Sequence, residues 1–188
     1  MGNKVPSREE AYELLLKYNK SESLIHHALA VEAVMLHFAE KLGEEDVEKW
    51  GIIGLVHDLD YEMYPDEHCK MTEKILREEN WPEDYIRAIV SHGWKICTDV
   101  EPVETMEKVL YTIDELTGLI NATALMRPTG ISDMKVKSLK KKWKDKSFAA
   151  GVDREIIQEG SEMLDMDLNE IMEGTITAMR GVSEEIGL

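Results

Sequence analysis

Histidine and aspartate residues recur along this chain at positions where metal ions could be held. His57 and Asp58 close the apolar run 51–56, where a buried helix is expected to end. Imidazole and carboxylate groups are the ligands that ions such as Mn, Fe, Co, Ni and Zn take in proteins. Further candidates follow or interrupt helical apolar stripes rather than polar loops, and these are His27, His68, His92 and Asp114. The pattern indicates a metal-dependent enzyme.

Asp114 has the strongest physical case among these residues. It lies one turn after Leu110 on a mainly apolar helix face, between Ile113 and Thr117. An unpaired carboxylate in that position would cost several kcal/mol, and a divalent cation would remove this penalty. Side chains of successive helical residues point in different directions, so His57 and Asp58 cannot complete a site alone. Separate helices must contribute the remaining ligands.

Apolar residues at helical spacing, with capping signals between them, predict an all-α fold. Ser7 to Glu10 resembles a capping box, and Gly43 is expected to stop the helix that carries His27. We find no strand alternation, no repeat and no low-complexity tract. The expected helices run from Ser7 to about Asn19, from about Ser21 to Gly43, over 45–57, through 68–76, from Pro82 to His92, from Pro102 through Ile120, after Asp153 and from Asp167.

Length and charge restrict the class of protein. The chain has 188 residues with 43% hydrophobic residues, which suffices for one sizeable core, so we expect a single compact domain over 1–188. The formal net charge of −16 disfavours general binding to nucleic acid or to an anionic membrane surface. No window approaches the length of a membrane span, and the N-terminus does not resemble a signal peptide.

The spacing of the two cysteines matches no metal-binding or redox motif. Cys69 and Cys97 form no C-x-x-C or other ligand spacing, and two thiols are too few for a disulfide scaffold. A reducing compartment fits this usage best. We therefore expect a cytoplasmic protein.

The order of the six candidates resembles the pattern H…HD…H…H…D of the HD-domain superfamily of metal-dependent phosphohydrolases. The local sequences 27–31, 54–58 and 111–115 are also similar to the corresponding motifs of that family. The resemblance spans about Ser21 to Ile120, which implies an HD-like core over about 21–120 and a C-terminal helical extension over about 131–188. The pattern reads His27, His57-Asp58, His68, His92 and Asp114 in this chain.

The resemblance implies a role for each of these residues. A primary ion would be held by His27, His57, Asp58 and Asp114. His68 and His92 would hold a second ion with Asp58 bridging, or contact the phosphate of the substrate. The cofactor would thus be one or two divalent ions, drawn from Mn, Fe, Co, Ni, Zn or Mg.

The implied activity is hydrolysis of a phosphate ester of a small nucleotide or related metabolite by a metal-activated water, with Asp58 and His57 as catalytic residues. The Gly-Tyr-Pro signature of the cyclic-dinucleotide branch is lacking, so that substrate is not assigned. One alternative is a metal- or nucleotide-binding regulatory module without turnover, and a third possibility is an iron-dependent oxygenase on the same scaffold. The sequence leaves the oligomeric state open.

Residues beyond the His-Asp pair bear on the substrate. Many relatives place a basic residue after the pair, whereas this chain continues with Asp60 and Glu62, for which we favour a solvated loop over a second layer of carboxylates. Positive charge for a substrate phosphate must then come from elsewhere. The candidates are Arg127, Lys137 and Lys141, with a solvated basic helix face as the alternative.

Overall fold

The computed structural model describes residues 4–188, which form helices and connecting loops without a β-strand. This confirms the all-α fold class. The helices in chain order are α1 (Arg8–Tyr18), α2 (Glu22–Leu42), α3 (Val47–Val56), the short 3-10 helix η1 (Pro65–Glu67), α4 (Lys70–Glu78), α5 (Glu83–Ser91), α6 (Thr105–Leu125), α7 (Val136–Trp143), α8 (Arg154–Leu164) and α9 (Leu168–Gly181).

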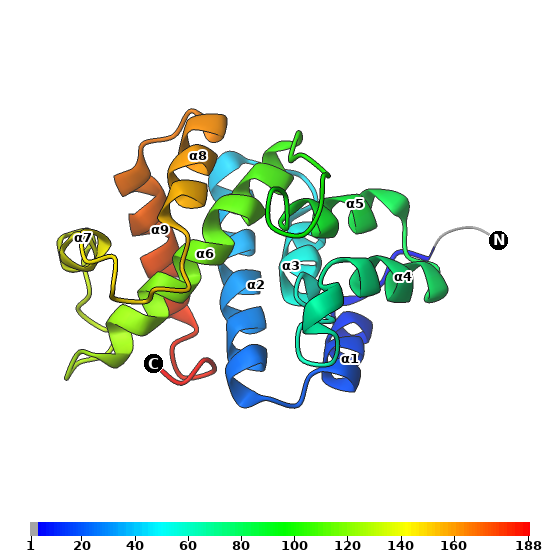
Figure 1. Cartoon of the computed structure of the whole chain (residues 1–188), viewed down its shortest axis with the longest axis horizontal. Coiled ribbons are helices and arrows are strands. Elements are labelled where there is room, and N and C mark those ends of the chain that lie inside the picture. Colours follow the sequence, from blue (N-terminus) through cyan, green and yellow to red (C-terminus); the bar gives the residue numbers. More distant parts are fainter. Residues whose placement is uncertain (1–3) are drawn as a thin grey trace.

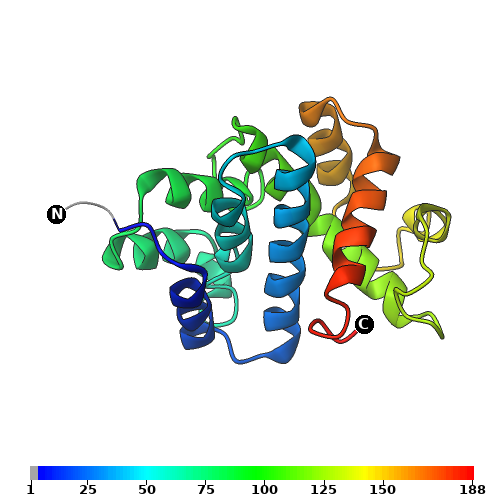
Figure 2. The ribbon, with the colours of Figure 1, turned by 180° about the vertical axis from the view of Figure 1, so that it is seen from behind.

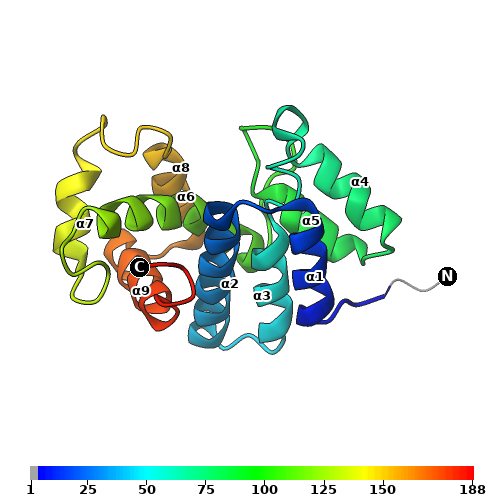
Figure 3. The ribbon, with the colours of Figure 1, turned by 90° about the horizontal axis from the view of Figure 1, so that it is seen from below.

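Two long helices form the middle of the molecule. α2 and α6 have 21 residues each, and Figure 1 shows them between α1, α3, α4 and α5 on one side and α7, α8 and α9 on the other. The view from below in Figure 3 shows the same division. Both helices bury apolar stripes, including Val34 and Phe38 of α2 and Leu110 and Ile113 of α6. Side chains that emerge near the middle of α2 and α6 therefore lie deep in the fold.

Capping residues set the ends of these helices. The capping box at Ser7 is confirmed, and Gly43 ends α2 in the left-handed conformation at φ 73°. The prediction that Pro102 opens α6 is wrong, because the helix begins at Thr105. Glu104 and Glu107 form a reciprocal capping box there, and this satisfies amide groups that a start at Pro102 would leave free.

α3 is buried almost all round, and two glycines let it approach α2 closely. A Cβ atom at Gly54 would come within 3.1 Å of the Val31 carbonyl oxygen, and one at Gly51 would meet the Leu36 side chain at 2.7 Å. Larger residues would push the two helices apart. This close packing brings His57, at the end of α3, to the face of α2 that carries His27.

The C-terminal helices cover the opposite side of α2 and α6. Figure 2 shows α9 beside α2, where Gly174 lies against the Phe38 ring, and α8 packs on α6 with Gly160 against Thr112. α7 lies at the outer edge next to α6 and α9. Over residues 4–188, none of the helices combines the length and apolarity needed to cross a bilayer.

Candidate metal centre

Four of the six predicted ligands meet where α2, α3 and α6 come together. His27 Nε2 lies 3.0 Å from Asp114 Oδ1 and 3.2 Å from His57 Nε2. His57 Nε2 lies 3.3 Å from the same Asp114 oxygen and 3.5 Å from Asp58 Oδ2. One donor atom from each of these four residues lies within 4.8 Å of all the others. We call this group the primary half of the cluster.

The other two predicted ligands meet Asp58 from its opposite side. His68 Nε2 and His92 Nε2 each lie 3.4 Å from Asp58 Oδ1, and 3.2 Å from each other. We call His68, His92 and this oxygen the second half. The two oxygens of Asp58 thus face different pairs of histidines, Oδ2 toward the primary half and Oδ1 toward the second. The fold brings all six predicted metal ligands together from positions up to 87 residues apart.

The outer nitrogen of three of these histidines is held by a fixed partner. His57 Nδ1 lies 2.8 Å from the Gly54 carbonyl oxygen, and His92 Nδ1 lies 2.6 Å from that of Ile89. His68 Nδ1 lies 2.8 Å from Asp60 Oδ1. Each partner can only accept, so Nδ1 carries the hydrogen and donates it. The Nε2 atoms then present lone pairs toward the centre.

This arrangement tests whether the residues suit a metal ion. Lone pairs on His68 Nε2 and His92 Nε2 that face each other at 3.2 Å repel unless a proton or a cation lies near both. The carboxylates of Asp58 and Asp114, which face the same small space, add to this need for positive charge. The donor set, imidazole nitrogens with carboxylate oxygens, fits a divalent transition metal in each half.

Asp60 departs from the favoured prediction. Its side chain is fully buried, and it accepts hydrogen bonds from His68 Nδ1 and, at 2.8 Å, from the amide of Thr72. The solvated-loop interpretation is therefore wrong for Asp60, because the chain folds inward after α3 and α4 begins beside it. Glu62 is exposed and accepts from the amides of Lys20 and Ser21, which fits the loop interpretation.

Charge in the cluster shifts the pKa values of its members. Burial acts to lower the pKa of His57, but the carboxylates of Asp58 and Asp114 outweigh it and raise that pKa well above its ordinary value. Burial acts to raise the pKa of both carboxyl groups, but the charge of His57 and hydrogen bonds from histidines hold them well below their usual range. Without an ion, the cluster therefore holds protons on imidazole rather than on carboxylate.

Two thiols lie beside the second half, and the spacing of the cysteines in the sequence did not predict their contact. Cys69 Sγ and Cys97 Sγ are 3.0 Å apart as free thiols, and Cys69 groups with His68 and His92 as a further donor. Its hydrogen bond with Cys69 lowers the pKa of Cys97 to about 6, against the effect of burial. The available signal was positional, since Cys69 directly follows one predicted ligand and Cys97 comes five residues after another.

Glu115 is a second group that sequence reasoning left out. Burial and the neighbouring charge of Asp114 raise its pKa to about 7, while its carboxylate accepts a hydrogen bond from the Asp153 amide at 2.9 Å. Tyr61 also adjoins the cluster, with its exposed ring edge-on to His68 at 5.2 Å. Both groups border the centre without belonging to its donor set.

A cavity of about 150 Å³ lies beside the primary half and has His27 in its wall. The wall also includes Thr117, whose hydroxyl donates to the Asp114 carbonyl at 2.6 Å and lies 3.5 Å from His27 Nδ1. α2, α6 and α9 line the cavity together with the C-terminal residues. Polar and apolar groups alternate in its lining, including Ser23, His26, Asn121, Ala30, Met179 and Ile186.

The predicted phosphate-binding residues lie elsewhere. Arg127 lies beyond the end of α6 at Leu125, which is about 17 Å along the helix axis from Asp114 at 1.5 Å per residue. Its guanidinium donates to the Gly130 carbonyl and to Asp133. Lys137 and Lys141 line a groove between α7 and α9 that contains none of the six predicted ligands.

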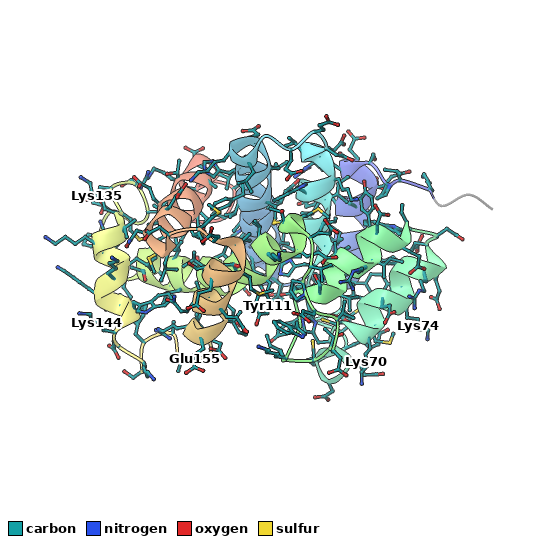
Figure 4. All side chains as sticks on the ribbon, turned by 90° about the horizontal axis from the view of Figure 1, so that it is seen from above. Lys70, Lys74, Tyr111, Lys135, Lys144 and Glu155 are labelled. Carbon is teal, nitrogen blue, oxygen red and sulfur yellow. The ribbon has the colours of Figure 1, made fainter. Side chains whose placement is uncertain are left out.

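Figure 4 shows where this basic helix lies. Lys135 and Lys144 of the α7 region stand at the end of the molecule opposite Lys70 and Lys74 of α4, with Tyr111 of α6 between them. The structure does not bring Arg127, Lys137 or Lys141 to the cluster. Their role toward a substrate stays a prediction.

The comparisons with known proteins agree with this geometry. A family model described as HD domain matches residues 24–139, which include all six cluster residues. Searches of curated proteins and of solved structures give no significant match.

Proposed function

The chain belongs to the HD-domain family, and on this premise we propose that it is a metal-dependent phosphohydrolase acting on a small phosphorylated metabolite or nucleotide. The HD domain is characteristic of a superfamily of metal-dependent phosphohydrolases, and the cluster offers suitable donors. The family and the donor chemistry together support this reaction class.

One observation carries the proposal, which is the orientation of Asp58. Its Oδ2 lies 3.5 Å from His57 Nε2, and its Oδ1 lies 3.4 Å from His68 Nε2 and His92 Nε2. A carboxylate with one oxygen toward each group of histidines is suited to bridge two ions. His27, His57 and Asp114 would complete the primary half, and His68 and His92 the second. We assign Asp58 and His57 to the catalytic centre for this reason.

Bound divalent ions would supply a water of lowered pKa and positive charge for the phosphoryl oxygens. The protein's own residues prepare the place for this chemistry. The carbonyl groups of Gly54 and Ile89 and the carboxylate of Asp60 fix the rings of His57, His92 and His68, so that little reorganisation is needed when ions bind. Burial of His57 and His92 keeps bulk water from these bonds.

The cavity beside His27 supports a small substrate. At about 150 Å³ it is comparable to a protein cavity that holds one benzene molecule, so it would accept a group of about one ring. Ser23, His26 and Asn121 could form hydrogen bonds with such a group, while Ala30 and Met179 offer apolar contact. We propose that this cavity receives the non-phosphoryl part of the ester.

The test is release of inorganic phosphate from a panel of small nucleotides and sugar phosphates, with Mn, Co, Ni, Fe or Mg added. We expect metal-dependent turnover of at least one compound, and loss of that turnover in Asp58→Ala. Asp66→Ala is the matched control, because Asp66 is an exposed carboxylate on η1 that is not part of the donor set. Absence of turnover over the whole panel would contradict the proposal and favour a regulatory module, and consumption of oxygen with bound iron would favour an oxygenase.

A further inference from the structure

Two thiols from separate segments meet beside the second half of the cluster. Cys69 lies between His68 and the start of α4, and Cys97 lies in the turn that follows α5. Their sulfur atoms are 3.0 Å apart, and each residue is a free cysteine. A disulfide bond requires about 2.05 Å between sulfurs, so an approach of roughly 1 Å would allow the bond to form.

The backbone around the two thiols is shaped to allow this approach. A Cβ atom at Gly93 would lie 2.4 Å from Cys97 Sγ and 2.6 Å from Cys69 Sγ, so only glycine leaves room for both sulfurs. The carbonyl oxygen of Gly93 accepts hydrogen bonds from the amides of Ile96, Cys97 and Thr98, which close the turn that carries Cys97. Cys69 itself has a positive φ of 65°, a conformation unusual for a residue with a side chain. The fold therefore maintains the contact at the cost of local strain.

The two thiols differ in access. Cys69 is 1% exposed, whereas Cys97 is partly exposed. A small oxidant in solution would thus meet Cys97 first and Cys69 only through it. This is the arrangement of an attacking thiol with a resolving thiol behind it.

We propose that Cys69 and Cys97 are a redox modification site, which forms a reversible disulfide with low-molecular-weight disulfides and joins the segments that carry His68 and His92. The Cys97 thiolate attacks one sulfur of the small disulfide, forms a mixed disulfide and releases one small thiolate. The Cys69 thiolate then attacks the Cys97 sulfur and releases the second small thiolate. The protein loses two electrons and two protons, and the small disulfide is reduced to two thiols.

The test uses the full chain in glutathione buffers from fully reduced to fully oxidised. Samples are quenched in acid, unfolded, alkylated with N-ethylmaleimide and weighed as intact chains. We expect the two alkylation sites to disappear together. The oxidised product should carry neither N-ethylmaleimide nor glutathione and should be lighter by two hydrogen atoms than the reduced chain before alkylation. Peptide mapping should show Cys69 joined to Cys97, and dithiothreitol should restore both sites.

Single-cysteine variants provide the matched controls. Cys69→Ser should accumulate one glutathione on Cys97, because no resolving thiol remains, and Cys97→Ser should keep its buried thiol free. The glutathione disulfide concentration that oxidises half of the unsubstituted chain should be roughly tenfold lower than the concentration that glutathionylates half of Cys69→Ser. The reason is that the second thiol already lies next to the first in the unsubstituted chain. Stable glutathione adducts on the unmodified chain, disulfides between chains, or two thiols that stay alkylatable in the oxidised buffer would each overturn the proposal.

Discussion

The two halves of the cluster share Asp58 but are built from different kinds of structure. The primary half takes His27 and Asp114 from the two 21-residue helices and His57 from the end of buried α3. The second half takes His68 from the connection between η1 and α4, and His92 from the residue after α5. Long helices with buried stripes fix side chains more firmly than short connections do. We therefore expect a tight primary site and a second site that responds more readily to its surroundings.

The primary half and the second half also differ in the groups that lie next to their histidines. His57 is fully buried and lies 3.5 and 3.3 Å from two carboxylates, whereas His68 is held by Asp60 and lies next to the thiol pair. The second half therefore has more ways to be altered without unfolding the core. Substitutions that separate the two halves should reveal this difference.

The largest effect should come from Asp58→Ala, which removes the one residue common to both halves. We expect a loss of metal from both halves and a decrease in phosphate release of roughly 10³-fold, because neither the primary nor the second site keeps its full donor set. Metal content by elemental analysis and phosphate release measure this together. Asp66→Ala should keep both, and retention of full metal content in Asp58→Ala would refute the shared position.

Substitution of one ligand from each half should have different consequences. Asp114→Ala should remove the primary ion, while His68→Ala should remove the second ion and leave the primary ion bound. Phosphate release should fall by roughly 10²-fold in His68→Ala. Titration with Mn, followed by equilibrium dialysis, counts the ions. His37→Ala is the control, because His37 lies on α2 against Phe38 and outside the donor set. Equal loss of both ions in His68→Ala would remove the distinction between the halves.

Asp60→Asn should weaken the second half alone. The substitution keeps the shape of the side chain but removes the charge that orients the Nδ1 hydrogen of His68, and such partners are typically worth about 10- to 100-fold in metal affinity. The measurement is the affinity of the weaker Mn site. Glu62→Gln changes an exposed carboxylate of the same loop and should leave that affinity unchanged. An effect on the tighter site would show that Asp60 acts on the whole cluster.

The sequence grouped six residues that the fold brings together, because each lies on a helical apolar stripe or at a helix end, and α2 and α6 follow directly from such stripes. Their role as metal ligands stays a prediction. The interactions around the second half were not predictable in this way. Asp60 looked like part of a polar turn, and only the inward fold after α3 buries it against His68 and Thr72. The contact of Cys69 with Cys97 depends on space at Gly93, which no spacing rule reveals.

The C-terminal half was harder to interpret from sequence. Lys137 and Lys141 have the right charge for phosphate, but α7 packs on α6 and α9 at the edge of the molecule. Periodicity places residues on a helix face and does not say where the helix lies. The single-domain interpretation over 1–188, with an HD-like core and a C-terminal extension, stays a prediction.

Metal binding in the primary half should depend on pH. The pKa of His57 lies well above its usual value of 6.5 without an ion, so its ring carries a proton near neutral pH that an ion must displace. Affinity should therefore rise with pH, by at most about tenfold per pH unit for this proton, and level off above the raised pKa. Isothermal titration with Mn in buffers of different ionisation enthalpy measures the proton release. A pH-independent affinity of the tighter site would contradict this assignment.

The same pKa shifts make the stability of the metal-free protein depend on pH. The pairing of charged His57 with its carboxylates stabilises the fold below the unfolded pKa of histidine, and this contribution is lost as the pH rises through the raised pKa. For Asp58 and Asp114 the sign is opposite. Their lowered pKa values give stability above the unfolded pKa of aspartate, which is lost as the pH falls.

Electron paramagnetic resonance of the Mn-loaded chain tests directly whether Asp58 bridges two ions. With two Mn equivalents, we expect the six-line spectrum of isolated Mn to be replaced by the spectrum of an exchange-coupled pair. His68→Ala should show only isolated Mn at the primary half. Two bound ions that keep independent six-line spectra in the unsubstituted chain would contradict the bridging role of Asp58.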